Sequence, residues 1–303
     1  MPIGYNDSIM RYMDMLRKNE ITAHMLGHTY ALLAPVDTFS KSGRLFKFRS
    51  RLAHCARVAE WVLRFAEVEG GDIGVLAISA IFHDVGYHFE GEGHALYSAR
   101  LFRAYADRFL ASGAGNMATL AAGPEALAAL KKPADSRPAG SRPAGSRPAG
   151  SEPAGSAGSV SAAGSTSINC KAKQENEKEN ALSAAIRSAV SSKESINKIH
   201  DIILTHSDKH LPSRSLPLES NMLMDADILD EAGAIAVLFA VFNETESPAF
   251  DYYSAYARIK KQFDEDADMA GKFRTGEGLR HFNEMRRYIG GFIDGLGYEL
   301  GDI

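Results

Sequence analysis

A five-residue repeat near the middle of the chain most constrains the fold. Residues 136–155 read SRPAGSRPAGSRPAGSEPAG, four copies of one unit, and SAGSVSAAGSTS follows them. Proline removes backbone donors, and glycine and serine offer little side chain to bury, so this tract cannot compensate the entropy lost on ordering. With its weakly patterned flanks, including the charged KAKQENEKEN, the predicted disordered insert spans residues 112–181. A period of five matches no solenoid repeat.

The insert separates two parts of one predicted folded domain. Residues 1–111 hold N-terminal helices and the first part, and residues 182–303 hold the second part and C-terminal helices. Helix signals are frequent in both, such as Gly70 after one helix and Asp72 as the N-cap of the next. The apolar run at 73–82 also fits a buried strand by periodicity, but its length and its helical neighbours favour a helix. The expected fold class is an all-α helical bundle.

Composition narrows the range of functions. Of the 303 residues, 45% are hydrophobic, which is ample for a core. The net charge of -4 gives no general excess of basic residues, so we expect no stable nucleic-acid binding. Two cysteines, Cys55 and Cys170, make no disulfide framework. The N-terminus lacks an apolar signal-like core and no apolar run is long enough to span a bilayer, so we predict a cytoplasmic protein without a membrane partner.

Several histidines fall on the apolar sides of predicted helices. The stretch VLAISAIFHDVGYHFEGEGH at 75–94 buries an apolar run that ends in His83 and Asp84. A titrating ring and a carboxylate are costly to desolvate without compensation. His54, His94 and His206 also continue apolar stripes.

A lone inward histidine is usually a hydrogen-bonded core residue, but a group of them together with the DADILD segment would need many separate polar partners. One or two divalent ions would satisfy all of these groups at once. Imidazole and carboxylate donors without thiolate suit Mn, Fe, Co, Ni or Zn, and suit Mg alone less well.

The ordered set of these residues resembles the HD-domain metal-dependent phosphohydrolase superfamily. The set comprises a histidine at 54 followed by ARV, HDVG at 83–86, a later histidine before SAR, a helix ending in ILTHS, and LMDADILDEAGAIAV. The last segment is similar to a group of small stand-alone HD hydrolases. The resemblance covers residues 45–110 and 190–300 and implies an HD-domain helical bundle.

The resemblance also implies a set of metal ligands. Carried over residue by residue, the metal would be held by His54, His83, Asp84 and Asp227, because the AD-x-L pattern of the family falls on residues 226–229. Asp225 points elsewhere on the same helix, so we expect it to be solvated or to lie behind the ligands.

The resemblance leaves two roles for His94 and His206, of which the first is to bind a second metal ion. Two-metal HD enzymes carry two further histidines, and His94 and His206 occupy the corresponding places, with Asp84 bridging the ions. His94 follows Asp84 by only ten residues, and the GYP signature of one cyclic-dinucleotide class is missing. The alternative role for both histidines is contact with a substrate phosphate.

The implied activity is hydrolysis of a phosphate ester, in a nucleotide or a related small molecule, by metal-activated water. The catalytic residues would be Asp84, His94 and His206. The alternatives are a di-iron HD-type oxygenase and a non-catalytic nucleotide-sensing module. A homo-oligomer is also possible.

Cations near this site have two interpretations. Lys209 and Arg214 follow His206, and the basic cluster KSGRLFKFRSR at 41–51 leads into His54. They are either solvated surface residues or groups that attract an anionic substrate. Arg57, in the H-x-x-R-V position of the family, is expected to pair with a nearby carboxylate.

Overall fold

The computed structural model describes residues 11–37, 50–89, 92–111, 165–244 and 251–301. The chain divides into two units, Met1–Ala121 with Ala181–Ile303, and Ala122–Asn180. Within the described ranges the structure is helical without strands, which confirms the predicted all-α class. None of the helices in these ranges combines the length and the apolar character needed to cross a lipid bilayer.

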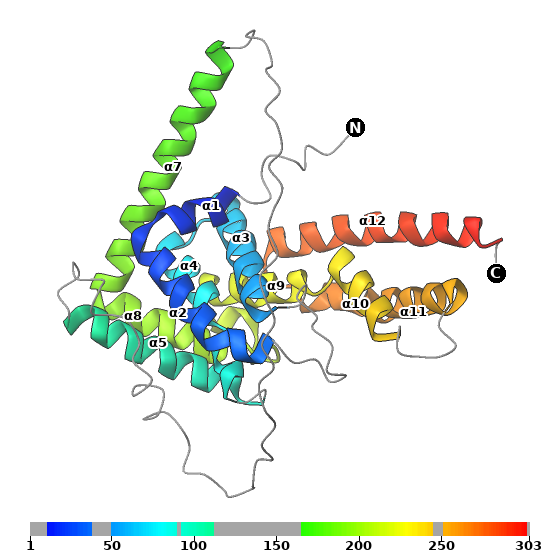
Figure 1. The fold of residues 1–303 in the computed structure, drawn as a ribbon, viewed down its shortest axis with the longest axis horizontal. Coiled ribbons are helices and arrows are strands. Elements are labelled where there is room, and N and C mark those ends of the chain that lie inside the picture. The colour runs from blue at the N-terminus through cyan, green and yellow to red at the C-terminus, as the bar shows by residue number, and fades with distance from the viewer. Residues whose placement is uncertain (1–10, 38–49, 90–91, 112–164, 245–250, 302–303) are drawn as a thin grey trace, which may run out of the picture. The chain divides into compact units, whose positions relative to one another are not determined.

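The α-helices follow one another along the chain (Figure 1) as α1 (Arg11–Lys18), α2 (Glu20–Asp37), α3 (Arg51–Glu69), α4 (Ile73–Phe82), α5 (His94–Ala111), α7 (Ser165–Ser191), α8 (Lys193–Thr205), α9 (Leu218–Asp230), α10 (Ala234–Glu244), α11 (Tyr252–Glu265) and α12 (Gly276–Glu299). Short 3-10 helices lie at η2 (Val85–His88), η4 (Ser213–Ser215) and η5 (Asp266–Lys272).

The ends of α3 and α4 follow from local sequence signals. Ser50 caps α3 by accepting a hydrogen bond from the backbone N–H of Ala53, and Gly70 ends it with a φ of 83° that suits glycine. Asp72 caps α4 by accepting from the backbone N–H groups of Gly74 and Val75. The predicted N-cap and the choice of helix over strand for the apolar run are both confirmed.

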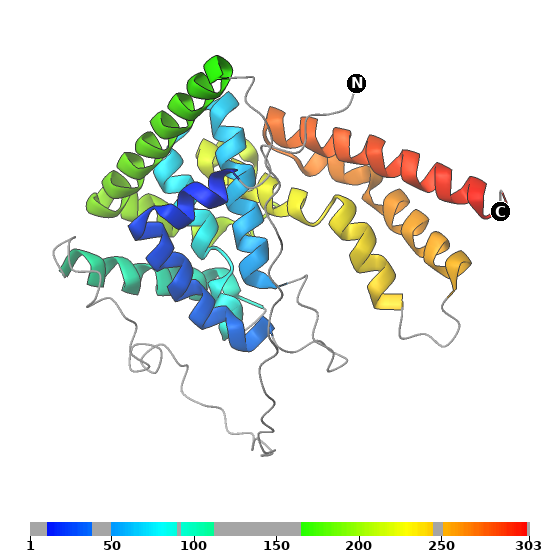
Figure 2. The ribbon, with the colours of Figure 1, turned by 45° about the horizontal axis from the view of Figure 1, so that its top comes forward.

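Helix α4 is the centre of the bundle. Each residue from Gly74 to Phe82 is buried, because α4 packs against α3, α8 and α9. Helix α5 packs against α8 and η2, and α3 packs against α9 (Figure 2). Helices that are far apart in sequence therefore bring their ends together around the C-terminus of α4.

Helix α11 packs against both α10 and α12 at the C-terminal end of the chain (Figure 2). Their small shared core contains Ile259, Ile289 and Ile293. Helix α12 also contacts α3 and α9, which connects this group to the bundle.

One boundary differs from the sequence-based prediction. Helix α7 begins at Ser165, so residues 165–181, predicted to be disordered, are helical; KAKQENEKEN is rich in strong helix formers. The remainder of the predicted insert, residues 112–164, lies outside the described residues. Helices α9 and α10 are separate, and α10 begins directly after Gly233.

Candidate metal centre

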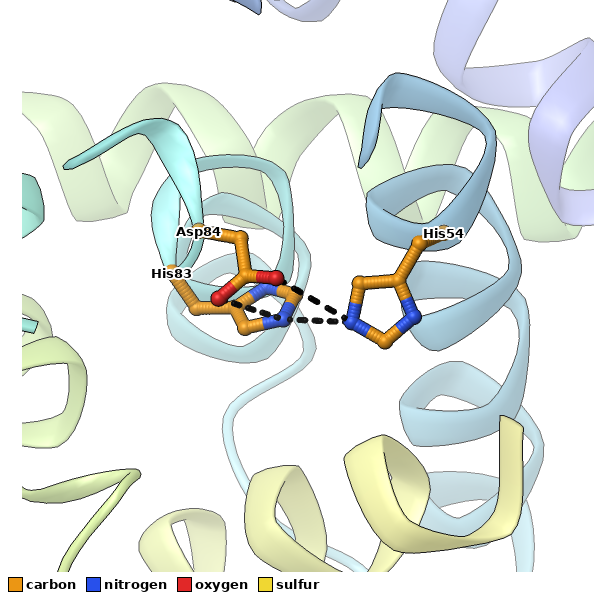
Figure 3. Close-up of side chains that lie close together, drawn as sticks. All are labelled: His54, His83 and Asp84. Carbon is orange, nitrogen blue, oxygen red and sulfur yellow. Dashed lines mark hydrogen bonds and ion pairs between the residues drawn. The ribbon is translucent and has the colours of Figure 1, made fainter. Parts of the chain in front are cut away.

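The first group of candidate ligands lies where α3 meets the end of α4 (Figure 3). His54 projects from α3, His83 is the C-cap residue directly after α4, and Asp84 follows it. Nε2 of His54 lies 3.1 Å from Nε2 of His83 and 3.4 Å from Oδ2 of Asp84. The three side chains therefore present one donor atom each to the same small space.

Helix α9 adds a carboxylate to this group. Oδ1 of Asp227 lies 3.1 Å from Nε2 of His54 and 3.9 Å from Nε2 of His83. The four side chains that the family resemblance names as ligands are thus brought together from three helices.

A second group shares Asp84. His94 begins α5 and His206 is the C-cap residue directly after α8, and their Nε2 atoms are 3.1 Å apart. Oδ1 of Asp84 lies 3.3 Å from Nε2 of His94 and 3.6 Å from Nε2 of His206. Because Oδ2 faces His54 and Oδ1 faces this second pair, the Asp84 carboxylate lies between the two groups.

Three of the four imidazole rings in the two groups are oriented by a hydrogen bond at Nδ1. His83 and His206 each lie at the end of a helix and donate back to a carbonyl three residues earlier, that of Ala80 at 2.8 Å and that of Ile203 at 2.6 Å. Nδ1 of His54 lies 2.8 Å from Oδ2 of Asp230. A carbonyl or ionised carboxylate only accepts, so these Nδ1 atoms carry the hydrogens and the Nε2 atoms present lone pairs.

The converging lone pairs require a positive charge. Imidazole nitrogens and carboxylate oxygens face one another without a hydrogen between them, which is unfavourable unless a proton or a metal ion lies there. Without a metal, a second proton on His54 supplies this positive charge. Burial lowers the pKa of His54, but hydrogen bonds to Asp227 and Asp230 outweigh burial and raise the pKa to about 10.

The remaining groups of the centre have perturbed ionisation. Burial lowers the pKa of His83 to about 4, which keeps this ring neutral and able to act as a ligand. Burial alone would raise the pKa of Asp84, but the neighbouring histidines His83, His206 and His54 lower it overall. The pKa of Asp227 is likewise lowered, because His54 and Lys209 outweigh the effect of burial. Both carboxylates are therefore ionised at neutral pH.

The donor set fits a divalent transition metal. Both candidate groups found among the described residues combine imidazole nitrogen with carboxylate oxygen, without a cysteine. Such donors suit Mn, Fe, Co, Ni and Zn.

Three cations surround the centre. Arg57 makes a two-point contact with Asp230, with Nε to Oδ1 at 2.6 Å and Nη2 to Oδ2 at 2.8 Å, which confirms the expected carboxylate partner for Arg57. Arg51 and Lys209 contact Asp84 and Asp227 respectively. Arg214, in contrast, is exposed on η4.

Asp225 is not solvated, which corrects one of the two alternatives predicted for it. Its side chain is fully buried and accepts hydrogen bonds from the backbone N–H groups of Arg274 and Thr275 and from the Thr275 hydroxyl. It fastens the start of α12 to α9.

Sequence reasoning missed Asp230. This residue lies three positions after Asp227, hence on a neighbouring part of the same helix face. An aspartate at this spacing from a predicted ligand is the signal that would have found it. The contacts of Arg51 with Asp84 and of Lys209 with Asp227 carry no comparable signal, because they join distant segments.

A comparison with known protein families finds a match for one segment of the chain. Residues 51–134 match the family model described as HD domain. No match was found among curated proteins or among solved structures. The matched segment contains the first candidate group except Asp227, together with His94 of the second.

Proposed function

We propose that this chain, which belongs to the HD-domain phosphohydrolase superfamily, is a metal-dependent phosphohydrolase that acts on a small phosphate ester. The observation that carries the proposal is the carboxylate of Asp84 between two histidine groups, each able to hold an ion. A nucleotide or a related molecule is the substrate class that we favour.

His54, His83, Asp84 and Asp227 would hold one ion, and Asp84, His94 and His206 a second. When bound in such a site, a divalent ion polarises a phosphoryl oxygen and lowers the pKa of a coordinated water. The chain itself fixes the geometry, because the Nδ1 hydrogen bonds of His54, His83 and His206 orient their rings.

Water access and proton transfer also depend on residues of the chain. The side chains of His83, His206 and Asp84 are nearly closed to solvent, with exposed fractions of 0%, 2% and 4%. Asp84 is ionised and lies at the centre of both groups, so it is the carboxylate best placed to accept a proton from an attacking water.

The shared carboxylate also suits a pair of iron ions, which makes a di-iron oxygenase the second candidate. Iron content and oxygen consumption distinguish this activity from hydrolysis.

The experiment that tests the proposal is a phosphate-release screen. Purified protein loaded with Mn, Co, Ni, Fe, Zn or Mg is incubated with nucleotides and other phosphate esters, beside the His83→Ala variant. We expect release with at least one metal by the wild type and none above background by the variant. Wild-type protein that contains stoichiometric metal and releases no phosphate would contradict the proposal.

A further inference from the structure

Two cations from distant segments flank the candidate metal centre. Nη1 of Arg51, at the start of α3, donates to Oδ2 of Asp84 at 2.9 Å. Nζ of Lys209, in the loop after α8, lies 2.7 Å from Oδ2 of Asp227. Each cation therefore contacts a carboxylate of the ligand set, and both of these carboxylates also lie beside His54.

Both cations are more exposed than the carboxylates that they contact. The side chain of Arg51 is 25% exposed and that of Asp84 is 4% exposed, and the side chain of Lys209 is 39% exposed and that of Asp227 is 13% exposed. A molecule that approaches the ligands from solvent on this side meets the guanidinium and the ammonium first.

The charges favour an anion once metal is bound. Without metal, Arg51 and Lys209 balance Asp84 and Asp227. A divalent ion held by these carboxylates would add two positive charges to this balanced set and leave a surplus of positive charge. Asp227 faces His54 with Oδ1 and Lys209 with Oδ2, so Lys209 can stay beside the bound ion. A phosphate dianion matches that surplus.

The backbone of Lys209 is held in place by Arg274. Arg274 donates from Nη2 to the carbonyl of Lys209 at 2.6 Å and from Nη1 to the carbonyl of Leu211 at 2.7 Å. The backbone N–H of Arg274 is itself held by Asp225. The loop that carries Lys209 is thus fastened to α9, the helix of Asp227.

Arg51 is held by a stack of rings. Its guanidinium carbon lies 3.8 Å from the ring centre of Tyr87, and the ring of His94 stacks on Tyr87 at 4.2 Å. At these distances the Arg51 guanidinium and the His94 ring must occupy opposite faces of the Tyr87 ring. Neither face of Tyr87 is therefore available to a nucleobase. The stack orients a cation and does not form a base-binding platform.

We propose that Arg51 and Lys209 form a phosphate clamp, which selects a phosphomonoester over a phosphodiester. This inference rests on the proposed function. A monoester carries close to two negative charges at neutral pH because its second pKa is near 6, whereas a diester carries one. Two cations beside the metal centre favour the more highly charged group, and a diester's second substituent would compete for the space next to one of them.

Binding of inorganic phosphate tests the clamp without requiring turnover. Full-length Mn-loaded protein is titrated with phosphate by calorimetry for the wild type, Arg51→Met, Lys209→Met and Lys209→Arg, after metal content has been measured in each. We expect phosphate to bind roughly 10- to 100-fold more weakly to each Met variant, as for loss of one charged hydrogen bond, with partial recovery in Lys209→Arg.

Lys198→Met is the matched control. Lys198 is 37% exposed and pairs with Glu219 at 2.8 Å, so it resembles Lys209 in exposure and in partner but lies outside the metal centre. It should bind phosphate within about twofold of the wild type, as expected for loss of a surface ion pair. If the two cations merely neutralise the carboxylates, Arg51→Met and Lys209→Met will bind metal differently while phosphate affinity stays at the wild-type value, and the clamp is overturned.

Hydrolysis of 4-nitrophenyl phosphate and bis(4-nitrophenyl) phosphate separates the two proposals. The clamp predicts that the wild type prefers the monoester and that the Met variants lose this preference. Weaker phosphate binding in the variants, together with a wild type that hydrolyses neither ester, would support the clamp and contradict the proposed function. Hydrolysis with unchanged phosphate binding would support the function and overturn the clamp, as would a Mn-loaded wild type that binds no phosphate.

Discussion

Asp230 orients the ring of His54: Oδ2 of the carboxylate lies 2.8 Å from Nδ1 of the imidazole. The same carboxylate is fixed by Arg57, so it is rigid as well as charged. His54 therefore presents Nε2, and not Nδ1, to Asp84 and Asp227.

The Asp230→Asn variant tests this role of Asp230. Removing the charge should lower the affinity for Mn by roughly 10- to 100-fold, as is typical for partners that orient metal-ligating histidines. A metal titration measures the change. The control is Asp201→Asn, an exposed aspartate beside His200, which should bind Mn as the wild type does. Equal affinities for both variants would show that Asp230 does not support the metal centre.

Asp225 and Asp227 lie two residues apart on α9 and should respond differently to the same substitution. Asp227→Asn should lose metal, because its carboxylate faces His54 and His83. Asp225→Asn should keep metal but unfold more easily by about 1–3 kcal/mol, because the amide replaces an oxygen that accepts hydrogen bonds at the start of α12. Metal content and chemical denaturation measure the two effects. The opposite pattern would assign the ligand to Asp225.

The stability of the fold should depend on pH through His28. Burial lowers its pKa to about 4, with smaller contributions from His24 and Arg108, whereas an unfolded histidine titrates near 6.5. Between these pH values the unfolded chain binds the proton more readily, so the free energy of unfolding falls as pH drops from 6.5 to 4. The loss attributable to His28 is about 2–3 kcal/mol.

His28→Gln provides the comparison for that loss. Denaturation of the wild type and the variant at pH 7 and pH 5 gives the difference due to this residue, since other titrating groups contribute to both. The drop in stability should be smaller in the variant. An equal drop in both proteins would mean that His28 is not buried in its neutral form.

The fold was predictable where local signals were strong. Ser50, Gly70 and Asp72 mark helix ends through capping, which depends only on neighbouring residues. The start of α7 was not predictable in the same way, because a charged segment rich in helix formers is compatible with either a helix or a disordered linker.

Site residues were predictable where the phase of a single helix or the family pattern was enough to place them. His54 and His206 are buried as their apolar stripes indicate. The burial of Asp225 was not predictable, because α9 is buried on nearly all sides and its phase does not separate an inner face from an outer one. The pairs of Arg51 with Asp84 and of Lys209 with Asp227 depend on tertiary packing alone.

Metal analysis of the full-length protein tests the central claim most directly. Wild type and the His83→Ala/Asp84→Ala double variant are purified in parallel, checked for equal helical content by circular dichroism, and measured for bound Mn, Fe, Co, Ni and Zn by mass spectrometry. The claim that these buried imidazoles and carboxylates hold a shared cation predicts at least stoichiometric metal in the wild type and almost none in a folded double variant. Equal metal content in the two folded proteins would contradict it.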